Sequence, residues 1–214
     1  MNKKGLFITF EGIDGSGKST QIELLANYLK KRNIDFILTR DPGGTDLGNC
    51  LRDILLNYKG KIFPTCELFL YLADRAQHIE EKIIPALNSG KVVLCDRFTD
   101  STIAYQGYAR GLDTTVINEL NSIVTQGLKP DITLLYDISV ETSLSRVGTK
   151  KDRLESENAD FHEQVRNGYL KLAEKYPERI KIIDANRDVQ SAFADTIKLL
   201  EKLVDSPDLT KKLD

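Results

Sequence analysis

The sequence lacks the features that would place it in a membrane or in an oxidising compartment. No apolar run approaches the roughly 20 residues that a bilayer-spanning helix needs, and the opening residues 1–5 lead into a short apolar segment without a signal-type stretch. The three cysteines, Cys50, Cys66 and Cys95, are odd in number and lack C-x-x-C spacing, which argues against a disulfide framework and a zinc site. We therefore predict a cytoplasmic protein whose cysteines are reduced and mostly serve as packing residues.

The sequence also lacks an excess of charge of one sign and is poor in histidine. Thirty basic residues stand against 32 acidic ones, a formal net charge of −2, so we expect neither nucleic acid nor a membrane as partner. The two histidines, His78 and His162, lie outside any motif and are expected to be ordinary helix residues. With 214 residues and no repeat or linker, the chain is expected to form a single domain over residues 1–214.

Short apolar, β-prone segments alternate with segments of helical periodicity. Strands are predicted at residues 6–10, 36–38, 92–95, 132–136 and 180–183. Helices are predicted after the first strand and at residues 67–88, 115–125, 160–175 and 189–204. This alternation predicts an α/β fold, a three-layer sandwich in which a five-stranded parallel sheet has helices on both faces.

A phosphate-binding loop lies between the first predicted strand and the first predicted helix. Residues 12–19 fit the pattern G-x-x-x-x-G-K-[ST] of the P-loop NTPases. The residues expected to bind the triphosphate are Gly12, Ile13, Asp14, Gly15, Ser16, Gly17, Lys18, Ser19 and Thr20. The glycines let backbone N–H groups point at phosphate oxygens, Lys18 reaches the outer phosphates and Ser19 offers its hydroxyl to magnesium. The sequence therefore predicts a protein that binds ATP or a related nucleotide together with Mg²⁺.

Charged residues follow the predicted strands, at the edge of a parallel sheet where ligands collect. They are Glu11, Arg40, Asp41, Asp96, Arg97, Asp137 and Asp184. Asp96, delivered by an apolar strand beside the phosphate-binding loop, is the candidate magnesium ligand, directly or through water. A helix N-cap or a solvated turn is the alternative for this aspartate. Arg97 adds a planar guanidinium that suits a phosphate dianion.

Four segments together carry a family resemblance over nearly the whole chain. They are residues 10–20 (FEGIDGSGKST), 39–45 (TRDPGGT), 96–98 (DRF) and 101–107 (STIAYQG). In these segments the sequence resembles bacterial thymidylate kinases. The resemblance implies a nucleoside monophosphate kinase-like fold, a homodimer with the helix at 67–88 as a plausible contact, and transfer of the γ-phosphoryl group of ATP to dTMP, giving dTDP for dTTP biosynthesis.

The resemblance also implies an acceptor site. Its residues would be Asp14, Asp41, Arg52, Tyr71, Arg75, Arg97, Thr102, Tyr105 and Gln106. Two arginines, Arg52 and Arg97, would hold the acceptor phosphate, and Arg75 would reach the thymine edge. Tyr71 would stack on thymine, where phenylalanine is more usual in the family; a core aromatic is the alternative.

Specificity is expected from the segment 101–107. Thr102 and Gln106 resemble the positions that hydrogen-bond the pyrimidine, and Tyr105 resembles the ring that crowds the 2′ position of the sugar. Polar groups that pair with thymine would be left unpaired by a wrong base, which disfavours it. Asp14 is expected to accept a hydrogen bond from the 3′-hydroxyl or to contact a magnesium-bound water, and a solvated loop acid is the alternative.

Catalysis is expected to depend on cations rather than on a base. The second pKa of a phosphate lies near 6, so the acceptor is already mostly a dianion at neutral pH. Lys18 and Arg97 would stabilise the transferring group with magnesium and with a lid at about residues 146–157, which carries Lys150, Lys151 and Arg153. In the family an arginine lies either in the phosphate-binding loop or in the lid. Because Gly15 occupies the loop position here, the resemblance implies Arg153 as the catalytic arginine.

Three other kinds of protein share parts of this pattern. Residues 149–152 (TKKD) fit the [NT]-K-x-D pattern by which GTPases read guanine, but a polar segment precedes them and the switch glycine of D-x-x-G is lacking after Asp96. A kinase for a hydroxyl acceptor would need a positioned base, and Glu11 is the candidate. A kinase for a different monophosphate is the third possibility.

Overall fold

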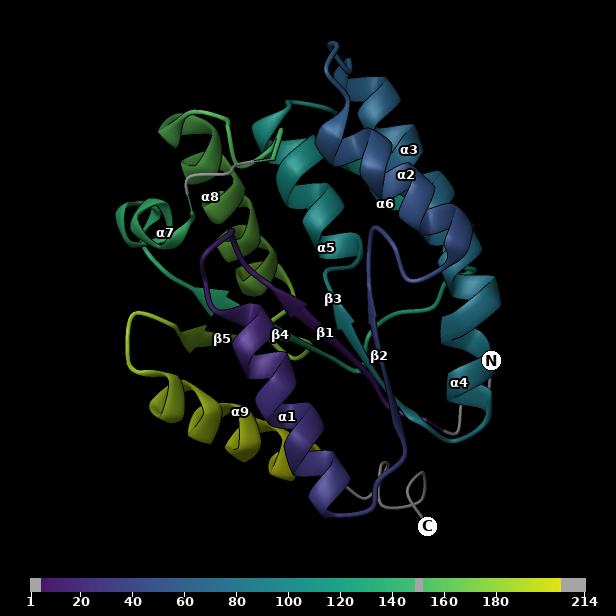
Figure 1. Cartoon of the computed structure of the whole chain (residues 1–214), viewed down its shortest axis with the longest axis vertical. Coiled ribbons are helices and arrows are strands. Elements are labelled where there is room, and N and C mark those ends of the chain that lie inside the picture. The colour runs from purple at the N-terminus through teal and green to yellow at the C-terminus, as the bar shows by residue number, and fades with distance from the viewer. Residues whose placement is uncertain (1–4, 149–151, 205–214) are drawn as a thin grey trace.

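A five-stranded parallel sheet forms the middle layer of the protein (Figure 1). The computed structural model describes residues 5–148 and 152–204. The strands are β1 (Phe7–Glu11), β2 (Phe36–Arg40), β3 (Val92–Asp96), β4 (Ile132–Asp137) and β5 (Ile180–Asp184), in the order β2-β3-β1-β4-β5. All neighbouring strands are parallel, which confirms the predicted sheet.

Each strand extends to the charged residue that follows its apolar segment, so the predicted ends lay one or two residues too early. The backbone of these residues still belongs to the ladder: Arg40 is in register with Asp96, and Asp137 with Asp184. The predicted ends came too early because the apolar pattern stops before the hydrogen-bonded ladder of the strands does. The last residue of each strand is charged. Five charged side chains therefore line one edge of the sheet.

Helices cover both faces of the sheet (Figure 1). One face is covered by α1 (Lys18–Lys31) and α9 (Val189–Val204), which pack against each other. The helices of the opposite face include α3 (Pro64–His78), the π-helical turn η1 (Ile79–Ile83), α4 (Ile84–Asn88) and α8 (Ala159–Lys175). The remaining elements are α2 (Asp46–Asn57), α5 (Thr99–Thr102), the π-helical η2 (Ile103–Ala109), α6 (Thr114–Val124) and α7 (Val140–Arg146).

The helices expected at 67–88, 115–125, 160–175 and 189–204 are confirmed with ends within three residues. Three helical segments were not predicted: α2, the α5–η2 pair and α7. Their sequences are short or contain glycine and β-branched residues, so their intrinsic helix propensity is weak. Packing against neighbouring helices then determines that these segments are helical. In the described part of the chain, no helix has both the length and the apolar character to cross a bilayer.

The prediction that the cysteines mostly serve as packing residues is wrong for two of the three. Cys95 is buried in β3, whereas Cys50 on α2 and Cys66 on α3 are exposed. All three are free thiols. The two exposed cysteines lie on helix faces that point away from the core, which the residue type alone could not indicate.

Three buried titratable side chains cluster beside the loop that follows β2. One ligand-type atom each from Asp41, Asp74 and His78 lie within 4.8 Å of one another. Asp41 accepts two hydrogen bonds from Arg75, and Asp74 Oδ1 accepts one from the Gly43 N–H at 2.9 Å. Burial, and then the charge of Asp41, raise the pKa of Asp74 to about 8. Asp74 is therefore largely protonated at neutral pH.

Replacing Asp74 by asparagine should weaken the pH dependence of stability. A carboxyl group whose pKa is raised on folding stabilises the fold fully below its unfolded pKa near 3.8, and this contribution is lost as the pH rises to about 8. Wild-type unfolding free energy should therefore fall relative to that of Asp74→Asn between pH 5 and pH 8, by at most about 1.4 kcal/mol per pH unit. Denaturant titrations across this range measure it, with the exposed Asp53→Asn as control. A constant difference between wild type and Asp74→Asn would contradict the prediction.

Candidate active site

The phosphate-binding loop connects β1 to α1 and has the curled backbone that its glycines predict. Gly12, Gly15 and Gly17 have φ values of 138°, 72° and 85°, in the region that side chains rarely adopt. A Cβ on Gly12 would also lie 2.4 Å from the Tyr136 carbonyl oxygen. Gly17 is the N-cap of α1 and has no side chain to occupy the first N–H groups of the helix. These N–H groups remain available to an anion.

Lys18 folds back onto this loop. Its Nζ donates to the carbonyl oxygens of Gly12 at 3.0 Å and Ile13 at 2.9 Å, and to Ser16 Oγ at 3.3 Å. Burial, and then the charge of Arg97, lower the pKa of Lys18 to about 8. The ammonium group is thus held beside the loop by neutral oxygens, which a phosphate oxygen can replace.

A hollow of about 400 Å³ lies over the loop and is rich in basic side chains. Its arginines are Arg40, Arg52, Arg97 and Arg146, and its acids include Asp96. Asp96 Oδ1 is buried and has no hydrogen-bond partner in the described part of the chain, and Asp96 and Ser19 line the same hollow. An unpaired carboxylate oxygen near a hydroxyl suits a hard cation such as Mg²⁺.

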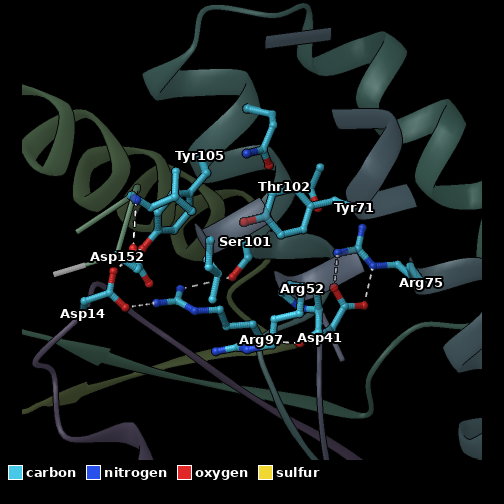
Figure 2. A pocket seen from close by; sticks show the side chains of 14 residues that line it. Asp14, Asp41, Arg52, Tyr71, Arg75, Arg97, Ser101, Thr102, Tyr105 and Asp152 are labelled. Atoms are coloured by element: carbon cyan, nitrogen blue, oxygen red, sulfur yellow. Dashed lines mark hydrogen bonds and ion pairs between the residues drawn. The ribbon is translucent and has the colours of Figure 1, made fainter. Parts of the chain in front are cut away.

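A second pocket adjoins this hollow, and it contains every residue that the resemblance implies for the acceptor (Figure 2). Its lining includes Asp14, Asp41, Arg52, Tyr71, Arg75, Arg97, Thr102, Tyr105 and Gln106. Four of these, Asp14, Asp41, Arg52 and Arg97, also line the hollow over the phosphate-binding loop. The two sites therefore share one charged wall.

Arg97 forms the centre of the shared wall. It directly follows β3 and has a left-handed backbone, with φ of 68°. Its Nη2 lies 2.5 Å from Asp14 Oδ1, and its Nη1 donates to the Gly12 carbonyl at 3.1 Å and to the Tyr169 hydroxyl at 3.2 Å. The guanidinium carbon also lies 5.1 Å from the centroid of the Tyr105 ring.

Asp14 is held in its charged form by these neighbours. Burial alone would raise its pKa, but the charges of Arg97 and Lys18 outweigh burial and hold the pKa of Asp14 below its ordinary value. Asp14 Oδ2 also accepts a hydrogen bond from the Tyr105 hydroxyl at 3.3 Å. The carboxylate thus lies at the junction of the two pockets.

Arg75 lies at the other end of the acceptor pocket and is almost completely buried (Figure 2). It makes two hydrogen bonds to Asp41, at 2.8 and 2.9 Å, and donates to Asn121 Oδ1 at 2.7 Å and to the Phe98 carbonyl at 3.2 Å. These bonds use four of its five N–H groups. Asp41 therefore orients Arg75 in this structure, and one N–H of Arg75 remains for a ligand.

The other residues expected to contact the base differ in whether their polar atoms already have hydrogen-bond partners. Thr102 Oγ1 is buried and without a hydrogen-bond partner among the described residues, so it is available to a ligand. Gln106 donates its Nε2 to Glu67 Oε1 at 2.8 Å. Tyr71 is buried in the wall of the pocket, and burial raises the pKa of its hydroxyl above the ordinary value.

The structure does not place Arg153 over the phosphate-binding loop. Its Nη2 is ion-paired with Glu67 Oε2 at 2.6 Å, and its Nε donates to the Leu55 carbonyl at 2.8 Å. Another arginine of the 146–157 segment, Arg146, does line the hollow over this loop. Its Nη1 lies 3.5 Å from the Gly15 carbonyl oxygen. Lys150 and Lys151 lie outside the described residues.

Sequence reasoning missed Glu67 and Asn121 as residues of the site. Arg40, expected at the edge of the sheet, and Arg146, the first residue of the predicted lid, were given no individual role, and both line the hollow over the phosphate-binding loop. Glu67 and Asn121 lie inside helices that only the fold brings to the pocket, and we see no sequence signal for them.

Glu11 does not have the surroundings of a catalytic base for an external hydroxyl. It is fully buried, lines neither pocket, and accepts hydrogen bonds from the Phe98 N–H, the Ser101 hydroxyl and the Tyr169 hydroxyl. Burial, and then the charge of Asp100, raise its pKa to about 7. Glu11 instead fixes the backbone that carries Arg97.

Known proteins similar to this chain point to one family. A family model described as thymidylate kinase matches residues 10–196. A thymidylate kinase of Desulfovibrio desulfuricans is 54% identical over 192 residues, which cover 85% of this chain and 88% of the relative. One of Caldanaerobacter subterraneus is 48% identical over 200 residues, covering 93% and 96%. The crystal structure of thymidylate kinase from Ehrlichia chaffeensis superposes with a TM-score of 0.76 at 39% identity, covering 92% of this chain and 98% of that one. With its P-loop sandwich and its paired pockets, the chain belongs to the thymidylate kinase family.

Proposed function

We propose that this protein is a thymidylate kinase, an ATP-dependent phosphotransferase that moves the γ-phosphoryl group of ATP to dTMP and releases dTDP and ADP. The observation that carries the proposal is the pair of adjoining pockets with a shared wall. Two anions that meet end to end at Asp14, Arg52 and Arg97 are arranged for direct transfer between them. The cytoplasmic location remains a prediction.

The donor phosphates would lie on the phosphate-binding loop. The free N–H groups at the start of α1 receive phosphate oxygens, and Lys18 exchanges its carbonyl partners for them. Arg146, at the rim of the hollow, adds a positive charge on the solvent side. The catalytic role that the resemblance implies for Arg153 would require its side chain to leave Glu67 and Leu55 in order to reach the phosphates.

The acceptor would lie with its phosphate at Arg52 and Arg97 and its base beside Tyr71. The remaining N–H of Arg75 and the unpaired Thr102 hydroxyl supply hydrogen bonds for the base edge. At neutral pH the phosphate is already mostly a dianion, so the reaction needs no protein base. Catalysis therefore comes from alignment and from positive charge around the transferring group.

Ser19 and Asp96 are the residues that would hold Mg²⁺. The buried, unpaired Oδ1 of Asp96 and its place in the hollow with Ser19 support this proposal. When bound, the ion supplies positive charge to the phosphate oxygens. Regular secondary structure fixes the backbone of both residues, because Asp96 is the last residue of β3 and Ser19 belongs to the first turn of α1.

Replacing Asp96 by asparagine should weaken the binding of magnesium at this site. A neutral amide is a poorer partner for a divalent cation than a carboxylate, so half-maximal turnover should need about tenfold more free Mg²⁺, or more still. Rates measured against free Mg²⁺ at constant ATP test this, with Asp53→Asn as the exposed control. An unchanged magnesium requirement would remove Asp96 from the metal site.

A panel of acceptors tests the proposed function directly. With Mg²⁺ and ATP, ADP should form fastest with dTMP, and thymidine should be slower by at least about 100-fold, because the positioned cations act on an acceptor phosphate. Rapid phosphorylation of thymidine would favour the hydroxyl kinase. Preference for dCMP or dGMP would favour another monophosphate kinase, and hydrolysis of GTP without acceptor would favour the GTPase.

We also propose that two copies of the chain pair through α2, α3 and α6. These helices lie side by side at one end of the molecule (Figure 1) and expose large apolar side chains. The exposed residues on them are Leu47, Ile54, Phe69, Val116 and Ile123. A second copy is the occupant that we infer for this surface, because the resemblance to thymidylate kinases implies a homodimer and exposed large apolar side chains often mark protein–protein contacts.

A charge on this surface should therefore separate the copies. Phe69 is 55% exposed on α3, so Phe69→Asp should leave the fold intact and shift the molecular mass from dimer to monomer. Light scattering after size exclusion gives the mass. Val189→Asp, at an exposed position of α9 on the opposite face, is the matched control. A monomeric wild type, or a dimeric Phe69→Asp, would contradict the proposal.

A further inference from the structure

Glu67 joins three separate segments of the chain at the edge of the acceptor pocket. It lies on α3, and its side chain is fully buried. Its carboxylate accepts a hydrogen bond from Gln106 at 2.8 Å, contacts Arg110 at 3.3 Å and forms an ion pair with Arg153 at 2.6 Å. A buried carboxylate is tolerated because two guanidinium groups compensate its charge.

The contact with Gln106 fixes which end of its amide faces the pocket. A carboxylate between two arginines only accepts hydrogen bonds, so the nitrogen of the Gln106 amide must point at Glu67. Gln106 lines the acceptor pocket, and its oxygen is then the group left for a ligand. An oxygen can accept the N3–H of thymine, whereas the N3 of cytosine carries no hydrogen to donate.

The contact with Arg153 holds a wall of the same pocket. The Arg153 backbone N–H donates to the Leu56 carbonyl at 3.2 Å, in addition to the side-chain hydrogen bond to the Leu55 carbonyl and the ion pair with Glu67. Its neighbours Asp152 and Leu154 line the acceptor pocket, and Leu154 is buried. The turn is closed locally, because Asp152 Oδ1 accepts the N–H groups of Leu154 and Glu155 at 2.8 and 2.9 Å.

We propose that Glu67 is a positioning residue for the acceptor base, which orients the Gln106 amide and, through Arg153, holds the turn at residues 152–155 against the acceptor pocket. Arg153 then acts with Glu67 on acceptor binding rather than on the transferring phosphoryl group. This inference deepens the proposed function and rests on it. It assigns to Glu67 the discrimination between pyrimidines with and without a hydrogen on N3.

Substitutions at the two ends of the ion pair test this assignment. Glu67→Gln can donate a hydrogen bond, so the Gln106 amide is no longer fixed. Arg153→Ala removes the ion pair with Glu67 and the hydrogen bond to the Leu55 carbonyl. Each should raise KM for dTMP about tenfold with kcat within about threefold of wild type, and Glu67→Gln should also lower the preference for dTMP over dCMP. Because both act through one contact, the double variant should be no worse than the more affected single variant.

Three further measurements make the outcome decisive. Glu81→Gln is the matched control, because Glu81 accepts a hydrogen bond from Gln77 on the same helical run but is exposed. Arg97→Ala, which removes a cation beside the transferring group, should lower kcat by orders of magnitude, unlike the two substitutions at the ion pair. Calorimetric binding of dTMP without ATP should weaken in Glu67→Gln and Arg153→Ala by the same factor as KM rises. If Glu67→Gln does not fold, Arg153→Lys tests the inference instead, because Arg153 is less buried than Glu67. Lysine cannot make both the ion pair with Glu67 and the hydrogen bond to the Leu55 carbonyl.

The results that would overturn the inference are distinct from those that would overturn the proposed function. Loss of kcat by orders of magnitude in Arg153→Ala at unchanged KM would make Arg153 a catalytic cation, and the inference would be wrong. Unchanged KM and unchanged pyrimidine preference in Glu67→Gln would also reject it. If wild type neither binds nor phosphorylates dTMP, the proposed function itself fails.

Discussion

The position of one guanidinium, that of Arg97, depends on the order of the strands and in turn organises both pockets. Because β1 and β3 are neighbours, the loops that follow them meet, and Arg97 faces Asp14 at 2.5 Å. The left-handed backbone of Arg97, which is unfavourable for a residue with a side chain, is held by its N–H bond to the Phe10 carbonyl. Buried Glu11 accepts the next N–H, that of Phe98, and so fixes the same turn from the other side. The fold therefore stabilises a strained residue at the point where donor and acceptor must meet.

Arginines gather at the site, although the chain as a whole carries a formal charge of −2. Three arginines of the acceptor region each have an acidic partner: Arg75 has Asp41, Arg97 has Asp14 and Arg153 has Glu67. Arg52 instead donates to the Pro42 carbonyl oxygen at 2.9 Å. A guanidinium taken out of water without such a partner would cost several kcal/mol. These acids therefore act on the reaction indirectly. They hold cations in fixed directions before any substrate is present, so that less reorganisation is needed when the phosphates arrive.

Sequence reasoning succeeded where the determining interactions are local. The apolar strand segments and the glycine pattern of residues 12–19 are local signals, and the parallel sheet and the curled loop agree with them. The nine acceptor residues came from the family resemblance instead; all nine line one pocket, and their roles stay predictions. It failed where partners are distant in sequence. Arg153 and Glu67 are far apart in the chain, and a charged segment at 146–157 gives no sign that one arginine points to a buried glutamate while another, Arg146, lies over the phosphate-binding loop. The exposure of Cys50 and Cys66 was missed for the same reason, since the helix packing that decides it is not encoded at either residue.

Substrate binding at this site replaces interactions more than it adds them. Lys18 already donates to three oxygens of the loop, and Arg97 already pairs with Asp14, so a phosphate gains only the difference between itself and these partners. A dianion competes well with neutral carbonyl oxygens and with a single carboxylate, whereas a neutral hydroxyl competes with neither. Glu11 directly precedes the phosphate-binding loop, and its pKa is raised to about 7, but it is not needed as a base. Its carboxylate oxygens already accept hydrogen bonds from the Phe98 N–H and from the hydroxyl groups of Ser101 and Tyr169. Selection for a phosphorylated acceptor thus follows from the pairing of Arg97 with Asp14 within the site.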